Sequence, residues 1–428
     1  MKTLVIAEKP SVARDIARVL GCAKKENGAL EGNQYIVTWA LGHLVTLKDP
    51  EDYDKKYKEW NMAVLPMMPE KLQIKVIPQT GKQYHAVTTQ LARKDVGEVV
   101  IATDAGREGE LVARWILDKA HNQKPCKRLW ISSVTDKAIR EGFASLKDAK
   151  EYDNLYRAAV SRAEADWLVG INATRALTCK YNAQLSCGRV QTPTLAMIAQ
   201  REQEIREFVP KPYYTVTAAA GGAVYTWKDE KSGGTRISDP EKAKQIAEKA
   251  KRYPLVLQKV EKKKKQKEAP LLYDLTELQR DASARFGYSA KQTLNLMQSL
   301  YETHKVLTYP RTDSRYLTKD IVPTLKERLD AVSIGPYKTL AQQAKRRPLK
   351  EKPGFVNDAK VSDHHAIIPT EQYVQLSALS NEERRIYDLV VRRFLAVLLP
   401  PCVYEETVIQ ASIEKECFTA RGKRMVEK

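Results

Sequence analysis

In the first 150 residues, short apolar runs alternate with stretches of helical character, and this alternation restricts the fold more than any other feature of the sequence. Residues 3–7, 98–103 and 128–132 are the apolar runs. Helical patterns occupy residues 10–20 and 111–120. Strands interleaved with helices form a parallel sheet with helical crossovers. We therefore expect an α/β domain at the N-terminus.

Acidic side chains follow two of the expected strands. Glu8 directly follows the first apolar run and Asp104 the second. Ligands of open α/β sheets bind at the carboxyl ends of the strands, so both carboxylates are expected at one edge. With Glu108, at the entry to the next helix, they suit Mg²⁺, which prefers hard oxygen ligands. Acids in a first helical turn can instead complement the helix dipole, but these three together, with Lys9 alongside, favour a phosphoryl-transfer site.

The chain is strongly basic. Lysine and arginine total 72 and aspartate and glutamate 53, so the formal charge is 72 − 53 = +19. Such an excess favours a polyanionic partner, with nucleic acid first and an anionic membrane surface second. The alternative is a basic surface that only maintains solubility.

Exported and membrane-spanning classes are disfavoured. The apolar start is broken by Glu8 and Lys9, unlike a signal peptide, and no run approaches the roughly 18–20 apolar residues that cross a bilayer. The six cysteines include no Cys-x-x-Cys pair, which argues against a zinc ribbon or finger. We expect reduced thiols in a cytoplasmic protein.

A second informative string is Leu-Thr-Tyr-Pro-Arg-Thr-Asp-Ser at residues 307–314. A phenol can attack a phosphodiester when its proton is removed and the phosphate charge is neutralised. Because the ordinary tyrosine pKa is about 10, Tyr309 would need cationic help. Arg311, two residues away, offers a bidentate clamp for a phosphate. Taken alone, a tyrosine before proline is more often part of a turn or a packed core.

Two strings resemble the halves of a Toprim metal site, the module shared by type IA topoisomerases, bacterial primases and some nucleases. They are Ala-Glu-Lys-Pro-Ser around Glu8, and Thr-Asp-Ala-Gly-Arg-Glu-Gly-Glu beginning at Thr103. The Toprim pattern has Asp-x-Asp-x-Glu in the second half, where this chain has Gly106 at the middle position. The resemblance therefore implies one Mg²⁺ held through Glu8 and Asp104. Glu108 would be a ligand or an outer group.

The tyrosine string resembles the active-site signature of type IA topoisomerases, and in particular of the bacterial topoisomerase III subfamily. Three further strings agree and occur in the family order: Ser-Arg-Ala-Glu-Ala-Asp-Trp-Leu-Val-Gly (161–170), Ser-Cys-Gly-Arg-Val-Gln-Thr-Pro-Thr (186–194) and His-His-Ala-Ile-Ile-Pro-Thr (364–370). The resemblance extends from the first residues to about Phe418.

By this resemblance, Tyr309 is the nucleophile that cuts one DNA strand and becomes linked to its 5′-phosphate without ATP. Arg311 and Lys9 would stabilise the transition state electrostatically. Glu8 would protonate the departing 3′-oxygen or hold Mg²⁺ that does so through water. His364 would lie near the scissile phosphate, and the alternative is an ordinary core or surface histidine.

Binding should favour single-stranded DNA, which needs cations for phosphates and aromatic faces for bases. Trp167 and Trp60 would stack on bases or pack in the core. The expected DNA contacts are Arg175, Gly188, Arg189, Val190, Gln191, Thr192, Pro193, Arg311, Trp167 and Trp60. The basic residues 262–267 are expected to be an exposed linker or edge. Gln298 and Glu302 match family positions only across a one-residue length difference.

The implied architecture is an N-terminal Toprim α/β domain followed by parts of the type IA toroid, namely helical, winged-helix-like domains and a strand-rich arch. The expected segments are a Toprim domain (1–150), a helical DNA-binding domain (151–212), the first part of the arch (213–272), a helical domain with the tyrosine (273–400) and a return to the arch (401–428). Such an enzyme would relax negative supercoils and decatenate DNA at the nucleoid as a monomer, with a helicase or single-strand-binding protein as partner.

Family members are usually longer, so we expect a chain truncated inside the arch. One alternative function is therefore a single-stranded DNA-binding remnant that has lost cleavage or strand passage. Another is a different Toprim enzyme, a primase or nuclease. The tyrosine string argues against the latter, because those enzymes form no tyrosyl-DNA bond.

Overall fold

The computed structural model describes residues 1–132, 134–347, 354–361 and 364–427 of the 428-residue chain. These residues form two compact units. The first comprises Met1–Ile198 and Leu271–Leu395, and the second comprises Ala199–Pro270 and Ala396–Lys428. All residues for which the sequence predicts a catalytic, metal-binding or specific DNA-contacting role belong to the first unit.

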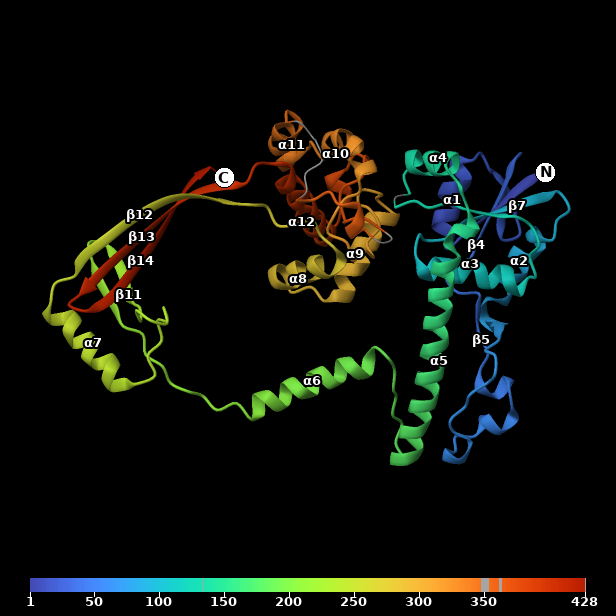
Figure 1. Ribbon diagram of the computed structural model, residues 1–428. Coiled ribbons are helices and arrows are strands. Elements are labelled where there is room, and N and C mark those ends of the chain that lie inside the picture. Colours follow the sequence, from blue (N-terminus) through green and yellow to red (C-terminus); the bar gives the residue numbers. More distant parts are fainter. Residues whose placement is uncertain (133, 348–353, 362–363, 428) are drawn as a thin grey trace. The chain divides into compact units, whose positions relative to one another are not determined.

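A seven-stranded sheet forms the core of the N-terminal part of the first unit (Figure 1). In spatial order its strands are β2 (Lys24–Glu26), β3 (Ala29–Glu31), β4 (Tyr35–Trp39), β1 (Lys2–Ala7), β7 (Val96–Ala102), β8 (Cys126–Arg128) and β9 (Lys147–Asp148). Strands β4, β1, β7 and β8 run parallel, and the outer strands pair antiparallel. The parallel centre confirms the predicted α/β fold.

Helices cover both faces of this sheet because its central strands are apolar on both sides. The covering helices are α1 (Pro10–Val19), α2 (Gly81–Leu91), α3 (Arg107–Lys119) and α4 (Asp136–Ala144). Leu4 and Ile6 of β1 share one core with α2 and α3. Val5 and Ala7, which point the other way, share a second core with α1 and α4. Alternate side chains of a strand face opposite sides, so a continuous apolar run predicts this double burial.

The third predicted apolar run, residues 128–132, is a strand only at its first residue. Leu129 N–H donates to the Ile101 carbonyl at 2.9 Å, which is the last bond to β7. The chain then leaves the sheet, because the Ser132 carbonyl instead accepts the Tyr309 N–H at 3.1 Å.

Helices also surround the tyrosine string. They are α8 (Leu275–Phe286), α9 (Ala290–Glu302), α10 (Leu325–Ala331), α11 (Lys338–Lys345) and α12 (Asn381–Leu398). Asp274 caps the start of α8, Gly287 ends it at a positive φ of 71°, and Ser289 caps α9. These caps set the boundaries of the helical stretch predicted for this region. After α9 the chain bridges Leu307 to Pro369, which brings the tyrosine string beside the histidine string.

The long helix α5 (Asp153–Tyr181) packs its first turns on the core beside α3, through Ala159. It is followed by α6 (Gln191–Arg206), whose side chains are exposed. A small sheet pairs β5 (Val45–Leu47) with β6 (Ile74–Val76). No helix among the described residues is long and apolar enough to span a membrane.

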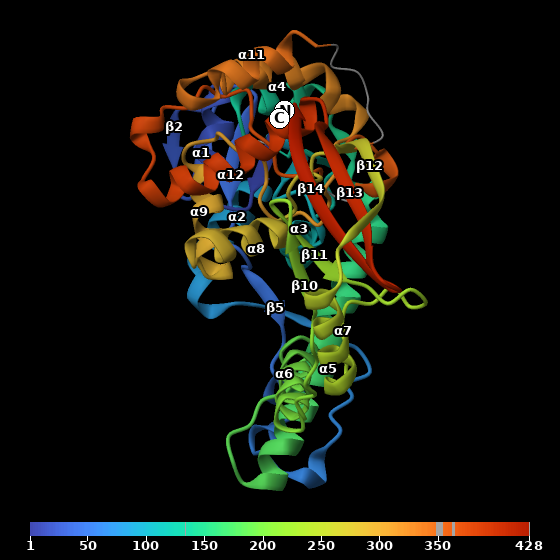
Figure 2. The same cartoon turned by 90° about the vertical axis from the view of Figure 1, so that its left-hand side faces the viewer.

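The second unit is an antiparallel five-stranded sheet with one helix packed on it (Figures 1 and 2). Its elements are β10 (Thr217–Ala220), β11 (Ala223–Trp227), β14 (Glu416–Glu427), β13 (Cys402–Ile413) and β12 (Val256–Lys267), in spatial order, and α7 (Pro240–Arg252). Gly221 and Gly222, both at positive φ, make the turn between β10 and β11. The basic residues 262–267 lie on β12, the exposed edge strand.

Candidate active site

The two carboxylates predicted at the strand ends meet in the structure. Strands β1 and β7 are adjacent and parallel, with Ala7 opposite Ala102, so the residues that follow them emerge at the same edge. The backbone N–H of Asp104 donates to Oε2 of Glu8 at 3.1 Å. The parallel sheet therefore places two acids side by side, as residue order within each strand predicts.

The proximity of these carboxylates disfavours their charged forms. Burial, and then the nearby Asp104, raises the pKa of Glu8 to about 7. Burial also raises the pKa of Asp104, although Lys9 acts in the opposite direction. A buried pair of like charges holds a proton more tightly than an exposed acid. The pair is therefore suited to exchange protons near neutral pH or to bind a cation.

Tyr309 lies against this acid pair. Its hydroxyl donates to Oδ2 of Asp104 at 3.4 Å, across 205 positions of sequence. Burial, followed by the charges of Asp104 and Glu8, raises the pKa of the phenol, while Arg311 lowers it. The resting phenol is therefore neutral, and Asp104 is the group in position to receive its proton.

Lys9 is held by the helix that precedes the tyrosine. Its Nζ lies 2.7 Å from Oε1 of Glu302, and Gln298 donates to the same oxygen. Burial lowers the pKa of Lys9, but the bond to Glu302 outweighs it and the net shift is upward. Lys9 thus stays charged beside the acid pair. Gln298 and Glu302, which the sequence matched only imperfectly, belong to this site.

His364 packs against Tyr309. Its ring centroid lies 4.3 Å from that of Tyr309, with the rings inclined by 30°. The side chain is 4% exposed, and burial, followed by His365, lowers its pKa to about 4. The imidazole is therefore neutral at physiological pH.

One cavity of about 330 Å³ joins these groups. Its lining includes every residue predicted to be catalytic or to bind metal, and it also includes Arg162 and Gln298. The predicted members are Glu8, Lys9, Asp104, Glu108, Tyr309, Arg311 and His364. The exposed guanidinium of Arg311 forms no hydrogen bond or ion pair with another described residue, so it is free to bind an anion. The sequence did not single out Arg162, although it lies in the 161–170 string.

The carboxylates fit a divalent cation through two residues rather than three. Glu108 is 56% exposed and pairs with Arg162 at 2.9 Å and with His43 at 3.8 Å. Across the described parts of the chain, no three His, Cys, Asp or Glu side chains gather as a ready-made metal site. Glu8 and Asp104 remain as adjacent oxygen donors, and Mg²⁺ is commonly held by one or two carboxylates plus waters.

Two features that the sequence analysis did not identify fix the loop that presents Asp104. A Cβ added to Gly109 would lie 1.9 Å from the Asp104 carbonyl oxygen, so only glycine fits there. Arg128, fully buried, donates to the carbonyls of Thr103 and Asp104 at 2.7 Å each and pairs with buried Glu110 at 2.5 Å. Glu110 thus anchors a buried arginine, whereas helix capping was the simpler expectation for an acid in a first turn.

The predicted DNA contacts lie mainly away from the cavity. Arg175 is buried, donates to the Tyr57 carbonyl at 2.5 Å and places its guanidinium over the Trp60 ring. The indole N–H of Trp167 donates to the Lys48 carbonyl at 2.9 Å. Residues 188–193 lead into α6, and Arg189 pairs there with Asp166. Of the predicted contacts, Arg311 alone lines the cavity, and the DNA roles of the others stay predictions.

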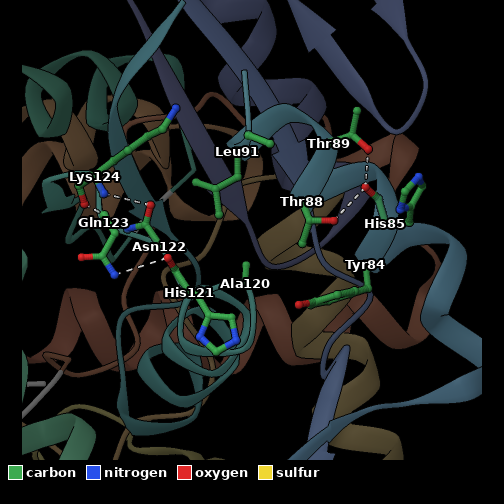
Figure 3. Close-up of a pocket in the computed structure, with 11 residues that line it drawn as sticks. Tyr84, His85, Thr88, Thr89, Leu91, Ala120, His121, Asn122, Gln123 and Lys124 are labelled. Atoms are coloured by element: carbon green, nitrogen blue, oxygen red, sulfur yellow. Dashed lines mark hydrogen bonds between the residues drawn. The ribbon is translucent and has the colours of Figure 1, made fainter. Parts of the chain in front are cut away.

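A second, larger cavity of about 580 Å³ lies near the C-terminal ends of α2 and α3 (Figure 3). Its polar groups are largely satisfied within their own segments. Thr88 and Thr89 donate to the His85 carbonyl, and Asn122 bonds to Lys124. None of the residues singled out from the sequence lines it.

The structure places a tyrosine against two carboxylates at the strand ends of a Toprim-like sheet. This arrangement is the one expected of a type IA topoisomerase, and comparison with known families gives the same class of protein. Residues 3–134 match the Toprim domain, and residues 150–428 match the family described as DNA topoisomerase. The chain belongs to the DNA topoisomerase family. Toprim domains typically bind a divalent metal ion.

Among individual relatives, the chain is 62% identical over 422 residues to DNA topoisomerase 3 of Bacillus subtilis (strain 168). It is 61% identical over 426 residues to DNA topoisomerase 3 of Bacillus anthracis. Each match covers 99% of this chain and 58% of the relative, so the chain spans little more than half the length of these curated relatives. These matches confirm the predicted likeness to bacterial topoisomerase III.

The fold is similar to that of full-length topoisomerase I from Thermotoga maritima. The TM-score is 0.73 at 23% sequence identity, and the match covers 99% of this chain and 66% of the other. Together with the Toprim match, this likeness confirms the predicted fold class.

Proposed function

We propose that this chain carries the strand-cleaving centre of a type IA DNA topoisomerase and that Tyr309 is its nucleophile. The observation that carries the proposal is the contact between the Tyr309 hydroxyl and Asp104 inside a cavity that also holds Lys9, Arg311 and His364. Neighbours of these types match what attack on a phosphodiester needs: a proton acceptor, cations and a neutral hydrogen-bonding group.

In the proposed reaction, the phenolic oxygen of Tyr309 attacks the phosphorus of a DNA phosphodiester. The bond from phosphorus to the 3′-oxygen breaks, and a 5′-phosphotyrosine bond forms. Asp104 accepts the phenol proton, and Glu8, whose pKa is raised to about 7, can supply a proton to the departing 3′-oxygen. One phosphodiester replaces another, so ATP is not required and the reverse step reseals the strand.

The cationic residues would stabilise the charge that develops on the phosphate. Lys9 and Arg311 line the same cavity as Tyr309, and His364 packs against the Tyr309 ring. Glu8 and Asp104 would hold Mg²⁺, which would screen the carboxylates and stabilise phosphate charge when bound. Arg162, drawn to the cavity edge by Glu108, would add a further phosphate contact.

The partner proposed for this site is single-stranded DNA. A formal charge of +19 and the exposed lysines of β12 support a polyanion, and a strand separated from its complement can enter a small cavity. Relaxation of negative supercoils and decatenation, by a monomer working at the nucleoid with a helicase or single-strand-binding protein, are proposed for the whole enzyme by family likeness. The domain boundaries and the DNA roles of residues 188–193, Arg175, Trp167 and Trp60 belong to the same proposal.

The test is a covalent trap. The protein is mixed with a single-stranded oligonucleotide labelled at its 3′ end, with Mg²⁺, and denatured before electrophoresis. We expect a slowly migrating labelled adduct that disappears in Tyr309→Phe. Tyr301→Phe, which alters a neighbouring tyrosine packed edge-on to Tyr309, should retain the adduct. DNA binding without an adduct would instead favour a binding remnant.

A further inference from the structure

The segment that leaves β8 contacts both the nucleophile and the histidine of the proposed site. The Ser132 carbonyl accepts the backbone N–H of Tyr309 at 3.1 Å. The Ser132 hydroxyl lies 3.1 Å from Nδ1 of His364. A single serine thus touches the two residues that must act together, and neither the family strings nor the sequence analysis singles it out.

The His364 ring is held from several sides. The Trp130 ring stacks with it, at 6.4 Å between centroids and an angle of 14°, and Tyr309 packs against it at 4.3 Å. Its Nε2 is buried and forms no hydrogen bond of good geometry within the described part of the chain, while the nearby backbone of Ala105 acts on the ring and raises its pKa, against the effect of burial. Buried polar atoms are rarely left unpaired. The free nitrogen of a ring that lines the cavity therefore points to a missing ligand group.

The protonation of Nδ1 decides what Nε2 can offer that ligand. Burial keeps the imidazole neutral, with a pKa of about 4. A neutral imidazole carries one N–H and one acceptor nitrogen. If the proton were on Nδ1, Nε2 could only accept, and it would face a phosphate oxygen that also only accepts. If a hydroxyl donates to Nδ1, the proton must lie on Nε2.

We propose that Ser132 is a positioning residue whose hydroxyl donates to Nδ1 of His364, so that Nε2 carries the proton offered to the phosphate. This inference rests on the proposed function, because it takes a DNA phosphate as the group that enters the cavity. The serine acts through the histidine and does not touch the reacting atoms. A serine hydroxyl is well suited to this role, since it can rotate to donate.

The kinetic test uses Ser132→Ala, which leaves the backbone bond to Tyr309 in place, and Ser132→Thr, which restores a hydroxyl. We expect Ser132→Ala to slow adduct formation about tenfold, which is the effect of losing one hydrogen bond in the transition state, with DNA affinity unchanged and with rescue by Ser132→Thr. Ser145→Ala removes an exposed hydroxyl that bonds only to backbone carbonyls and should have no effect. In a His364→Gln background, Ser132→Ala should cause no further loss. An equal loss in that background would overturn the proposal.

A spectroscopic test separates this inference from the proposed function. In protein labelled with ¹⁵N-histidine, the imidazole ¹⁵N shifts report which nitrogen is protonated, and His364→Gln identifies the resonances of His364. We expect protonated Nε2 and unprotonated Nδ1 in the unmodified protein, with a mixture of tautomers in Ser132→Ala. A proton on Nδ1, or a spectrum unchanged by Ser132→Ala, would refute the role of Ser132 even if cleavage occurs. If no adduct forms at all, the proposed function fails while this spectrum still decides the role of Ser132.

Discussion

At the scale of single residues, the site depends on groups that hold the catalytic side chains as much as on those side chains themselves. Glu302 and Gln298 hold Lys9, Ser132 contacts His364, and Arg128 binds the carbonyl of Asp104. The contacts of Lys9 with Glu302, of Ser132 with His364 and of Arg128 with Asp104 cross between segments that are distant in sequence, and Gln298 supports Glu302 from within the same helix. Substitutions at these supporting positions should therefore show whether each group contributes to the free energy of unfolding, to the rate of DNA cleavage, or to both.

Gly109→Ala should destabilise the protein and impair cleavage. The new Cβ would lie 1.9 Å from the Asp104 carbonyl oxygen, so the backbone that presents this carboxylate would have to move. Forced overpacking costs about 1–3 kcal/mol, and urea unfolding with the adduct assay would measure both effects. Gly106→Ala is the stability control, because its Cβ would meet open space. Equal unfolding midpoints for the two variants would contradict the expected clash.

Arg128→Met should lower the free energy of unfolding strongly. Arg128 and Glu110 are both fully buried, and removing one partner of a buried ion pair costs about 3–5 kcal/mol. Glu110 keeps its second partner, Arg114 at 3.2 Å, so we expect a loss near the lower end of this range. Arg18→Met removes an ion pair with Asp136 in which the two side chains are 53% and 41% exposed, so it should cost at most about 1 kcal/mol. Urea unfolding compares the two. Similar losses would show that the Arg128 pair stabilises no more than a surface pair.

At the scale of elements, sequence patterns predicted the helices and strands whose apolar residues form a continuous run or recur with helical spacing. Continuous apolar runs predicted β1 and most of β7, and helical spacing predicted α1 and α3. The short strands β2, β3 and β9 carry no such pattern, because two or three residues are too few to show a periodicity. The end of β8 at Arg128 was also missed, since it depends on bonds to the distant tyrosine string.

The candidate site was also predictable only in part, because many of its contacts join segments that are distant in sequence. Two strand-end acids meet because parallel strands end at one edge, which spacing alone indicates. Tyr309 lies 205 positions from its partner Asp104, so its place was available only from the family resemblance. The resemblance did not include Ser132 or Arg128, whose roles arise from contacts between segments. The exposed position of Glu108 likewise depends on Arg162 and His43 and not on the Toprim pattern.

The free energy of unfolding should fall at acidic pH, because an ion-paired carboxylate of strand β3 becomes protonated there. Glu31 of β3 bonds to Arg93 and Lys2, which lower its pKa to about 2. Because the folded pKa lies below the unfolded value, this contribution is fully present above about pH 4.5 and is lost as the pH falls toward 2. The side chains of Lys2 and Arg93 are 24% and 28% exposed, so solvent screening limits the contribution to about 1–2 kcal/mol. The measurement is the free energy of unfolding between pH 6 and pH 3. Glu31→Gln should flatten the decline, and an unchanged slope in that variant would disprove the assignment.

At the scale of the whole molecule, the proposed active site lies in the first unit, while the second unit carries a long exposed strand rich in lysine. Lys262, Lys264 and Lys267 of β12 are exposed and form no ion pair with other described residues. Lysines on an edge strand discourage pairing with another sheet, and they also provide sites for phosphates. Binding that depends on them should be electrostatic and independent of base sequence.

The triple variant Lys262→Gln, Lys264→Gln and Lys267→Gln should bind single-stranded DNA less tightly and with a weaker salt dependence. Each lost phosphate contact lowers the slope of log K against log salt by about 0.7, so three contacts lower it by about two. Fluorescence anisotropy across a salt series measures the slope. The control triple variant Lys24→Gln, Lys56→Gln and Lys251→Gln makes the same charge change at exposed lysines that pair with acids, and it should keep the original slope. Identical slopes for the two triple variants would mean that the salt dependence follows the net charge of the protein and not the lysines of β12.

The central claim is that Tyr309 forms the bond to DNA. The most direct measurement is tandem mass spectrometry of the protein trapped with a single-stranded oligonucleotide and Mg²⁺, after proteolysis and nuclease trimming. The account predicts a nucleotide 5′-phosphate on the peptide that contains residues 307–314, attached at Tyr309. A nucleotide on another residue, or a chain that binds DNA with Mg²⁺ and never forms the bond, would contradict it.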